Sequence, residues 1–370
     1  MPFAGDRPNI MTGTVNLFVG SLAAAFAMFG VTTGTMAQSA GLAGGDPRSF
    51  EDRFSLAWPE TDFTQTAVAS DEFLSGGPSK DGIPSIDDPQ FIRLKAGRTQ
   101  GWATRLDDRE AVISIDIAGD ARAYPLRVLI WHEIVNDEVG SVPVSVTYCP
   151  LCNASVVFDR RVDNRVLDFG TTGLLRHADL VMYDRQTESW WQQFTGEALV
   201  GRLTGRKLRK VPSRLESLAN FRQRYPDGLV LVPNDPRTRQ YGINPYEHYD
   251  TGGAPGFLTG EVDTGPLAPM DHVIVFEAGG KPNGVALSYL QKAARLEVNG
   301  VLLEWRAGQA SALDTRNIAE GRDIGNVTVR RRVQSQWVDV PHQVTFAFAF
   351  RSFFPTGVII STQFDHRRSN

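Results

Sequence analysis

Cysteine is scarce in this chain: its 370 residues include only two, Cys149 and Cys152, three positions apart. This scarcity excludes a small disulfide-stapled scaffold, and a chain of this length can bury a large core without staples. An excess of one charge is also lacking, because 38 Lys and Arg face 42 Asp and Glu. The net charge of −4 gives no electrostatic signature of nucleic-acid binding, so we expect no nucleic-acid partner.

Long apolar runs are lacking except near the start of the chain. Residues 15–31 read VNLFVGSLAAAFAMFGV, with Arg7 before them and Thr35-Met36-Ala37 behind them, which puts small residues at positions 35 and 37. This layout is typical of a secretory signal peptide, which we predict over residues 1–37. The alternative is an uncleaved membrane anchor, for which the run is short. The expected location is periplasmic or extracellular, where disulfides are permitted.

The rest of the chain divides by composition into four parts. Gly, Ser, Pro and Asp dominate one segment near the start, and a second segment is a long Gly, Pro, Asn, Asp and Tyr loop. Loops of that length in compact domains usually serve a function or are poorly ordered. The predicted parts are an extended N-terminal arm (38–101), a β-rich unit with both cysteines (102–232), the long loop (233–265) and a second β-rich unit packed on the first (266–370).

Short alternating apolar segments predict a β-rich α+β fold, mainly antiparallel sheet with a few short helices. The expected strands include residues 111–117, 142–148, 154–158, 165–169 and 180–183. Helices are expected after Pro125, where LRVLIWHEIV has helical apolar spacing, and after Pro212, over residues 213–225. The run VTFAFAFRSFF (344–354) alternates strongly and is interpreted as a core strand.

Two stretches of the chain align with each other at a fixed offset of 161. VISIDIAGDARAYPLRVL (112–129) matches VIVFEAGGKPNGVALSYL (273–290) at Val, Ile, Gly, Leu and Leu. The match has two interpretations: coincidence between amphipathic segments, or two related β-hairpin–helix units. The second stretch has no cysteine, and no histidine stands at the corresponding helix position. Any chemistry is therefore expected in the first.

The sequence Tyr148-Cys149-Pro150-Leu151-Cys152-Asn153 brings two thiols to one point. Such a pair suits a reversible disulfide or two sulfur ligands of one metal ion. A purely structural disulfide is the alternative. Closing a loop of about four residues contributes only ~2 kcal/mol of stability, which is little for a protein of this size. A functional pair is therefore favoured.

Several specific chemistries of this pair can be compared. A strand is expected after the second cysteine, so the helix that activates thioredoxin-like thiols is missing. Asn153 stands where covalent haem attachment requires histidine. Two thiolates are too few for zinc and suit copper(I) better, with His132 as the expected third ligand or acid–base partner. The alternative for His132 is a half-buried side chain bonded to a backbone carbonyl.

A second candidate pocket follows the segment 180–183. Asp184 and Arg185 either form an ordinary turn with a surface ion pair or stand at the rim of the site. Adjacent tryptophans in a strand point to opposite faces, so we expect one to pack in the core and the other to line a pocket. The candidate residues for contacting a cofactor or ligand are Trp131, Trp191 and Gln192.

Three blocks together carry a family resemblance: AYPLRVLIWHEIVND, VSVTYCPLCNASVVFDR and LVMYDRQTESWWQQFTGEALVG. From about Asp81 to Ile360 the chain resembles the domain-of-unknown-function 3179 family of exported bacterial and archaeal proteins. The resemblance implies a site around the two cysteines without naming its chemistry. It places ten residues at motif positions: Trp131, His132, Glu133, Cys149, Cys152, Asp159, Arg160, Asp184, Arg185 and Gln192.

The sequence thus predicts an exported protein that binds a soft metal, copper(I) before zinc, through Cys149, Cys152 and His132. One alternative is a thiol–disulfide oxidoreductase or other periplasmic enzyme using the same pocket, with Asp184 and Arg185 as further catalytic candidates. Another is a non-catalytic binding module with a structural disulfide. The expected partner is a small molecule or an exported protein, and membrane contact is expected only through an uncleaved N-terminal segment.

Overall fold

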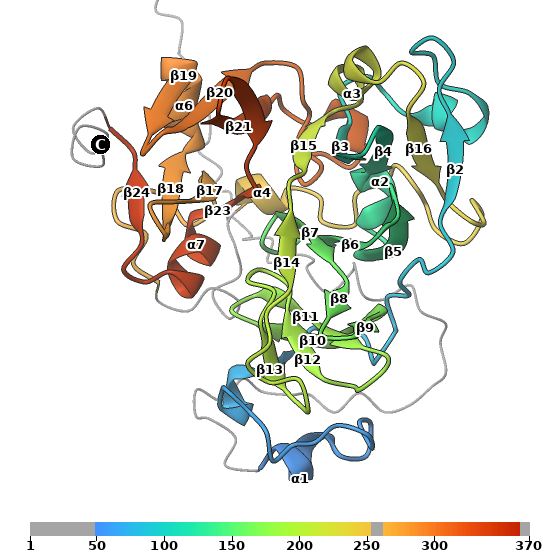
Figure 1. Ribbon diagram of the computed structural model, residues 1–370, viewed down its shortest axis with the longest axis vertical. Coiled ribbons are helices and arrows are strands. Elements are labelled where there is room, and N and C mark those ends of the chain that lie inside the picture. The colour runs from blue at the N-terminus through green and yellow to red at the C-terminus, as the bar shows by residue number, and fades with distance from the viewer. Residues whose placement is uncertain (1–48, 253–261, 363–370) are drawn as a thin grey trace, which may run out of the picture. The chain divides into compact units, whose positions relative to one another are not determined.

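The computed structural model describes residues 49–252 and 262–362, so the predicted signal peptide lies outside the described residues. Strands make up 42% of the structure and helices 15%, and most strand pairs are antiparallel (Figure 1). The predicted β-rich α+β class with a few short helices is therefore confirmed. Within the described ranges, no helix is long and apolar enough to cross a membrane.

The segment before the first unit is held to the fold by strand pairing at two points. It contains the helix α1 (Phe50–Phe54), the 3-10 helices η1 (Ser70–Glu72) and η2 (Gly101–Arg105), and the strands β1 (Leu74–Ser75) and β2 (Gln90–Arg93). β1 pairs antiparallel with β10 (Phe169–Arg176), and β2 pairs antiparallel with β16 (Leu229–Val232). These backbone ladders fix an otherwise irregular segment against two different sheets.

The first unit, coloured teal to yellow in Figure 1, combines a hairpin, a helical turn and a meander. In chain order it contains β3 (Ala111–Ile117), β4 (Asp120–Pro125), α2 (Leu126–Leu129), β5 (Ile134–Val139), β6 (Val142–Cys149) and β7 (Ala154–Asp159), and later β15 (Arg214–Ser217), α3 (Leu218–Arg224) and β16. Its two sheets have the strand orders β15-β3-β4-β16-β2 and β14-β7-β6-β5.

The second unit, orange to dark red in Figure 1, repeats this order. Its elements are β17 (His272–Ala278), β18 (Lys281–Ala286), α6 (Leu287–Ala293), β19 (Arg295–Val298), β20 (Val301–Arg306), β21 (Asn326–Val333), β22 (Gln336–Asp339), β23 (His342–Phe346), α7 (Ala347–Phe353) and β24 (Val358–Ile360). The sheet orders are β23-β17-β18-β24 and β19-β20-β21-β22. α4 (Tyr249–Gly252) and η3 (Ile318–Glu320) lie outside this repeated order.

Strand register shows that the two units are equivalent. Val112 pairs with Pro125 in the first hairpin and Val273 pairs with Ala286 in the second, which is the offset of 161 found in the sequence. The outer strands agree as well, because β15 pairs with β3 as β23 pairs with β17, and β16 runs parallel to β4 as β24 does to β18. The aligned stretches are therefore two related β-hairpin–helix units.

A further sheet is inserted into the first unit between β7 and β15. Its strand order is β1-β10-β11-β12-β13. The inserted elements are β8 (Arg161–Val162), β9 (Arg165–Val166), β10, β11 (Asp179–Asp184), β12 (Trp190–Gln192) and β13 (Ala198–Val200). The strand that follows them, β14 (Arg209–Val211), pairs with β7 as β22 pairs with β21. In the second unit only β22 stands between the corresponding strands, β21 and β23. The inserted sheet is thus a feature of the first unit alone.

The two units share one hydrophobic core and contact each other reciprocally. The main cluster of buried apolar side chains includes Val146 and Tyr148 of the first unit and Leu303 and Phe346 of the second. β7 contacts β23, and the equivalent pair with the units exchanged, β15 and β21, is also in contact. This exchange is the pattern of an approximate twofold relation. The meander of each unit, meaning the three antiparallel strands β5–β7 or β19–β21, packs on an outer strand of the other unit, β23 or β15.

Three sequence-based element assignments need correction. The predicted core strand 344–354 is β23 followed by the helix α7, whose first four residues, Ala347 to Phe350, are all buried. A helix buried on all sides has no polar face, so alternation alone could not distinguish it from a strand. Likewise, residues 213–225 form β15 and then α3, and the helix expected after Pro125 is the single turn α2, followed by β5.

Candidate metal centre

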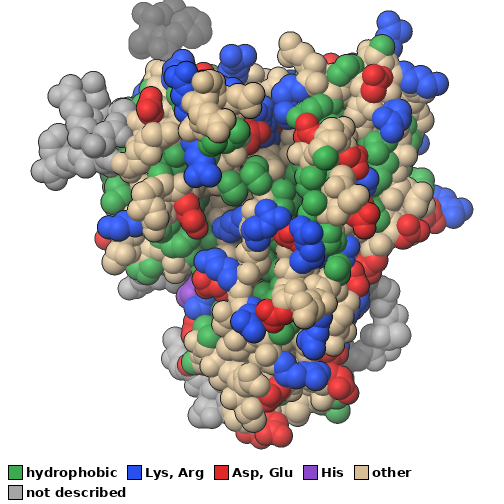
Figure 2. Space-filling model, in the orientation of Figure 1, with side chains coloured by type: hydrophobic (Ala, Val, Ile, Leu, Met, Phe, Trp, Pro, Cys, Tyr) green, Lys and Arg blue, Asp and Glu red, His purple; other side chains and the backbone are tan. Residues whose placement is uncertain are grey.

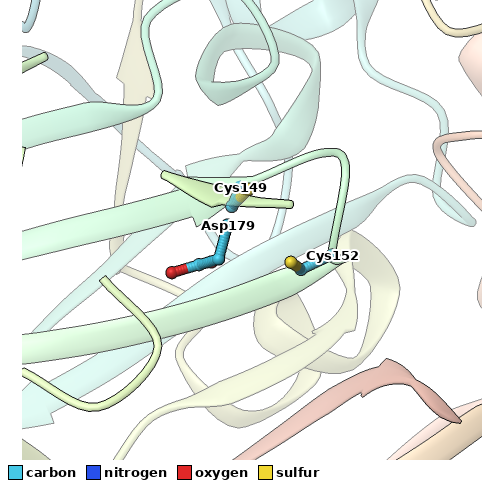
Figure 3. Close-up of side chains that lie close together, drawn as sticks. All are labelled: Cys149, Cys152 and Asp179. Atoms are coloured by element: carbon cyan, nitrogen blue, oxygen red, sulfur yellow. The ribbon is translucent and has the colours of Figure 1, made fainter. Parts of the chain in front are cut away.

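Two cysteine thiols and one aspartate carboxyl group lie close together where the first unit's meander faces the inserted sheet (Figure 3). Cys149 is the last residue of β6, Cys152 lies in the turn to β7, and Asp179 is the first residue of β11. Their ligand atoms, two sulfurs and a carboxylate oxygen, all lie within 4.8 Å of one another. The exposed fractions of the three residues are 1%, 0% and 0%. The cluster is therefore a closed group of two sulfurs and one oxygen that could surround a metal ion.

A strained hairpin turn holds a backbone carbonyl against the two thiols. His177 and Ala178, between β10 and β11, have φ angles of 54° and 59°, a left-handed conformation that usually favours Asn or Gly. The thiol of Cys152 donates to the carbonyl oxygen of Ala178 at 3.2 Å, and that of Cys149 does so at 3.9 Å. Strain of this kind is concentrated at functional sites because the surrounding structure must enforce it.

The two carboxylate oxygens of Asp179 differ in their hydrogen bonds. Oδ2 accepts hydrogen bonds from the Gln192 side-chain amide at 2.7 Å and from the Phe194 backbone N–H at 2.9 Å. Oδ1 is buried and has no hydrogen-bond partner among the described residues. An unpartnered buried carboxylate oxygen is costly, so its place beside two thiols calls for an explanation.

The cluster is acidic, and burial keeps its groups protonated. Burial raises the pKa of Asp179 to about 7, and it raises the pKa values of the Cys149 and Cys152 thiols above their usual range. The pKa of Glu133 is raised to about 8, first by burial and then by the negative charge of Asp179. Near neutral pH the thiols and Glu133 therefore carry protons and Asp179 is close to its midpoint, so a bound cation replaces protons at this cluster.

The structure does not bring His132 to the sulfur atoms. Its Nδ1 lies 2.8 Å from the Pro84 carbonyl oxygen and its Nε2 lies 2.8 Å from the Tyr241 hydroxyl, and its ring stacks on Tyr241. Asp179, and not the expected His132, lies beside the two sulfurs, and His132 has the contacts of the alternative interpretation, a side chain bonded to a backbone carbonyl. Its neighbour Glu133 has a left-handed backbone, with φ 59°, and is the member of this motif that interacts electrostatically with the cluster.

The residues expected to contact a ligand have different places in the structure. Gln192 touches the cluster directly, since it orients Asp179. Trp191 is fully buried and donates from Nε1 to Asp184 at 2.9 Å, while its neighbour Trp190 packs in a separate core on the opposite side of the sheet. Trp131 packs against the main core, and its Nε1 is buried without a partner in the described part of the chain.

The two Asp-Arg pairs stabilise turns and the N-terminal segment. Asp184 is fully buried and accepts from the backbone N–H of Thr187 at 2.7 Å. Arg185 binds Asp81 at 3.0 Å and so attaches the N-terminal segment to the inserted sheet. Arg160 donates to the Leu167 carbonyl at 2.9 Å, and Asp159 forms an ion pair with Arg161 at 2.7 Å. Asp184 thus has the expected role in a turn, but Arg185 pairs with Asp81 and Arg160 with Asp168, so neither arginine pairs with the aspartate directly before it.

Asp179 was missed at the level of sequence. The signal was limited to its place at the start of an expected strand, directly after Arg176-His177-Ala178. Nothing local indicates that the hairpin turn of the inserted sheet folds over the turn between β6 and β7. The pairing of Asp179 with the cysteines is a tertiary contact created by the insertion.

Comparison with known proteins identifies the family. The family described as "Protein of unknown function (DUF3179)" matches residues 80–357, which is most of the chain. The chain belongs to this family. The matched range contains both units except β24 and the inserted sheet except β1, and therefore the whole cysteine–aspartate cluster. No curated protein and no solved structure matches the chain.

Proposed function

We propose that this protein is exported and that it binds a thiophilic divalent metal, zinc in preference to copper(I), through Cys149, Cys152 and Asp179. The observation that carries the proposal is a fully buried cluster in which a carboxylate oxygen of Asp179 lies within 4.8 Å of both sulfurs, while the Oδ1 of this carboxylate has no hydrogen-bond partner among the described residues. Two thiolates alone favour copper(I), but a carboxylate oxygen is a harder donor that zinc accepts and copper(I) does not prefer. The expected preference for copper is therefore reversed by Asp179.

The three residues fit zinc in charge as well as in donor type. Two thiolates and one carboxylate give a charge of −3, which is costly to bury and which a dication reduces to −1. Zinc with three protein ligands keeps one position at which a bound water ionises near neutral pH. Gln192 orients the carboxylate ligand, and Glu133 adds a second buried carboxyl group that interacts with Asp179.

The test is metal analysis of anaerobically prepared protein. Wild-type protein is expected to hold stoichiometric zinc and, after exchange with cobalt(II), to show thiolate-to-cobalt absorption. Asp179→Asn is expected to weaken zinc binding by about tenfold or more, comparable with or larger than the effect of losing an outer partner of a ligand. His132→Gln serves as the matched control and is expected to retain zinc, because both ring nitrogens are bonded elsewhere.

The opposite pattern would overturn the proposal. Near-zero metal in both wild type and a Cys149→Ser/Cys152→Ser double variant would show that the cluster binds no metal. If His132→Gln lost zinc while Asp179→Asn kept it, the third ligand would be His132 and not Asp179. The export half is tested separately by cell fractionation, where the mature chain is expected outside the cytoplasm and shortened at about residue 37.

A thiol–disulfide oxidoreductase is the second candidate, favoured by the raised pKa of Asp179, about 7, beside two thiols. In that reaction Cys149 and Cys152 form a disulfide while a substrate disulfide is reduced to two thiols, which take up the two protons. Full burial of both sulfurs counts against it, because exchange requires access to the attacking thiolate. A measured potential well above about −300 mV would favour this reaction, and a lower one a structural bridge.

A further inference from the structure

The second unit contains a cavity of about 470 Å³ that the metal centre does not use. It lies beside the start of β17 and the start of α6, and the loop 307–325 forms another part of its wall. The lining residues on which the argument depends are Asp250, Asp271, His272, Ser288, Arg322 and Asp323. The equivalent place in the first unit shows what such a cavity can hold.

Asp271 of the second unit occupies the position of Glu110 in the first. The Glu110 carboxylate accepts from the backbone N–H of Asp107 at 2.9 Å, and the Asp271 carboxylate accepts from Ala268 at 2.9 Å, an equivalent bond at the offset of 161. The backbone carbonyls match too: that of Glu110 accepts from the first residue of α3, and that of Asp271 from the first residue of α7. The two carboxylates are thus anchored in the same way.

The two positions differ in what faces the carboxylate. In the first unit Arg127 of α2 forms an ion pair with Glu110, with Nε to Oε2 at 2.8 Å, and Glu110 is fully buried. The residue equivalent to Arg127 is Ser288, whose side chain is too short to fill that space. Asp271 is correspondingly exposed and lines the cavity. The second unit therefore keeps the carboxylate and lacks the guanidinium that it binds in the first.

A buried histidine provides an independent sign of a ligand site. His272 is 7% exposed and lines the cavity, and its Nε2 is buried without a hydrogen-bond partner among the described residues. Burial lowers the pKa of His272 to about 3, so the ring is neutral at physiological pH. A neutral ring nitrogen can accept a hydrogen bond from an N–H of a ligand.

The charge of the lining favours a cation. Asp250, Asp271 and Asp323 outnumber the one basic residue, Arg322, whose NH1 already lies 2.9 Å from Asp250. The positive charge of Arg322 is thus offset within the wall, while Asp271 has no ion-pair partner in the described ranges. An anionic ligand would face this excess of carboxylates, whereas a planar cation with several N–H donors would satisfy both Asp271 and His272.

We infer that this cavity binds a small molecule carrying a guanidinium group, which takes the place that Arg127 occupies in the first unit. The Asp271 carboxylate supplies the charge-assisted hydrogen bonds, and His272 accepts from a further N–H. This site is separate from the metal centre, so neither proposal depends on the other.

The test is a titration of the intact protein with methylguanidinium chloride at constant ionic strength, followed by ligand-observed NMR. Saturable binding is expected, with N-methylurea, the neutral analogue of similar shape, binding much more weakly. Asp271→Asn is expected to weaken binding by about tenfold, the loss typical of one hydrogen bond to a charged group. Ser288→Arg is expected to abolish binding, because it restores the first unit's arginine and fills the cavity.

Two matched variants separate this site from other effects. Asp71→Asn removes one carboxylate outside the cavity and is expected to leave binding unchanged, as is the Cys149→Ser/Cys152→Ser double variant. Circular dichroism checks that each variant is folded. Equal binding of methylguanidinium by wild type and Ser288→Arg, equal binding of N-methylurea, or no saturable binding to wild type would each overturn the inference.

Discussion

The two units have one backbone plan and two different connections at the same point. In the first, the last paired residues of the central hairpin, Cys149 and Ala154, are joined by the short turn 150–153. In the second, the equivalent pair, Arg306 and Asn326, is joined by the longer loop 307–325. The turn contributes a cysteine to the proposed metal centre, and the loop lines the proposed cation site. Equal scaffolds thus support different chemistry, because the connections carry it.

Charged side chains of both signs are mixed on the face of the molecule that Figure 2 shows. Lys and Arg side chains are interspersed with Asp and Glu over the described part of the face in Figure 2. Mixed charges of this kind fit the balanced composition of 38 basic and 42 acidic residues. Because the two units share one backbone plan, substitutions at equivalent positions are the sharpest way to examine how they differ.

The largest difference is expected at the paired positions Arg127 and Ser288. Arg127→Ala leaves Glu110 buried and without its ion-pair partner, and removing one member of a buried pair typically costs about 3–5 kcal/mol of unfolding free energy. Ser288→Ala removes only a hydroxyl beside a cavity and is expected to cost less than about 0.5 kcal/mol. Urea unfolding of both variants measures the contrast.

A double variant shows whether the cost comes from the unpaired charge. Arg127→Met combined with Glu110→Leu is expected to recover most of the stability lost in Arg127→Ala, because no charge is left buried. Equal losses in Arg127→Ala and Ser288→Ala would show that the two positions are not distinguished by this ion pair.

The second largest effect concerns the proposed metal centre, for which the described residues offer a ligand cluster in the first unit. Zinc at 100 times its dissociation constant is expected to stabilise the folded protein by about 2.7 kcal/mol. Because binding requires deprotonated ligands, zinc affinity is expected to rise with pH through the pKa of Asp179, about 7, and beyond it as the thiols ionise. Thermal unfolding with and without zinc, between pH 6 and 9, measures this; an affinity independent of pH would contradict it.

The metal-free protein is expected to show the opposite trend. Asp179 has a folded-state pKa of about 7 against an ordinary value of 3.8, so its proton stabilises the fold fully below the ordinary value. That stability is lost as pH rises toward 7, with a slope of about 1.4 kcal/mol per pH unit within the window. Asp179→Asn should flatten this part of the profile, and an unchanged slope in the variant would assign the effect to another group.

A third comparison uses two glycines that follow the equivalent helices α3 and α7. A Cβ on Gly228 would lie 2.6 Å from the Phe221 ring, and one on Gly357 would lie 2.7 Å from the Phe350 ring. Gly228→Ala and Gly357→Ala are each expected to cost about 1–3 kcal/mol through overpacking. Differential scanning calorimetry should show similar losses, whereas a loss confined to one unit would mean that the equivalence of their packing is only apparent.

These glycines also show what a sequence comparison can detect. Phe, Arg, Pro and Gly recur at an offset of 129 between α3 and α7 with the turns after them, for example at Gly228 and Gly357. The hairpin–helix alignment was visible because its two stretches match at a constant offset of 161. The second alignment was obscured, because the alternating sequence of 344–354 was interpreted as a strand and the offset there is 129 instead of 161.

The candidate site was predictable only where its residues are close in the chain. Cys149 and Cys152 form a local motif, so their spacing alone indicated a site. Asp179 joins them through the fold of the inserted sheet, and Glu133 through a left-handed residue at the end of a helical turn. His132 was chosen for its chemistry, but the chain geometry directs it toward Pro84 and Tyr241.

The smallest effect is expected at the turns between the first two strands of each meander. The first unit has Gly140-Ser141, with φ angles of 52° and 64°, and the second has Asn299-Gly300, with φ angles of 50° and 75°. Ser141→Gly relieves a left-handed non-glycine residue and is expected to raise the unfolding free energy by less than about 1 kcal/mol, partly offset by a more flexible unfolded chain.

The reverse change at the preceding position tests why the two turns use glycine at different places. A Cβ on Gly140 would lie 2.3 Å from the Ile117 carbonyl oxygen, so Gly140→Asn cannot copy Asn299 without moving the backbone. Urea unfolding is therefore expected to show Ser141→Gly at or above wild type and Gly140→Asn below it. If Gly140→Asn were as stable as wild type, the close approach of Ile117 would not be the reason for glycine there, and the turns would be interchangeable.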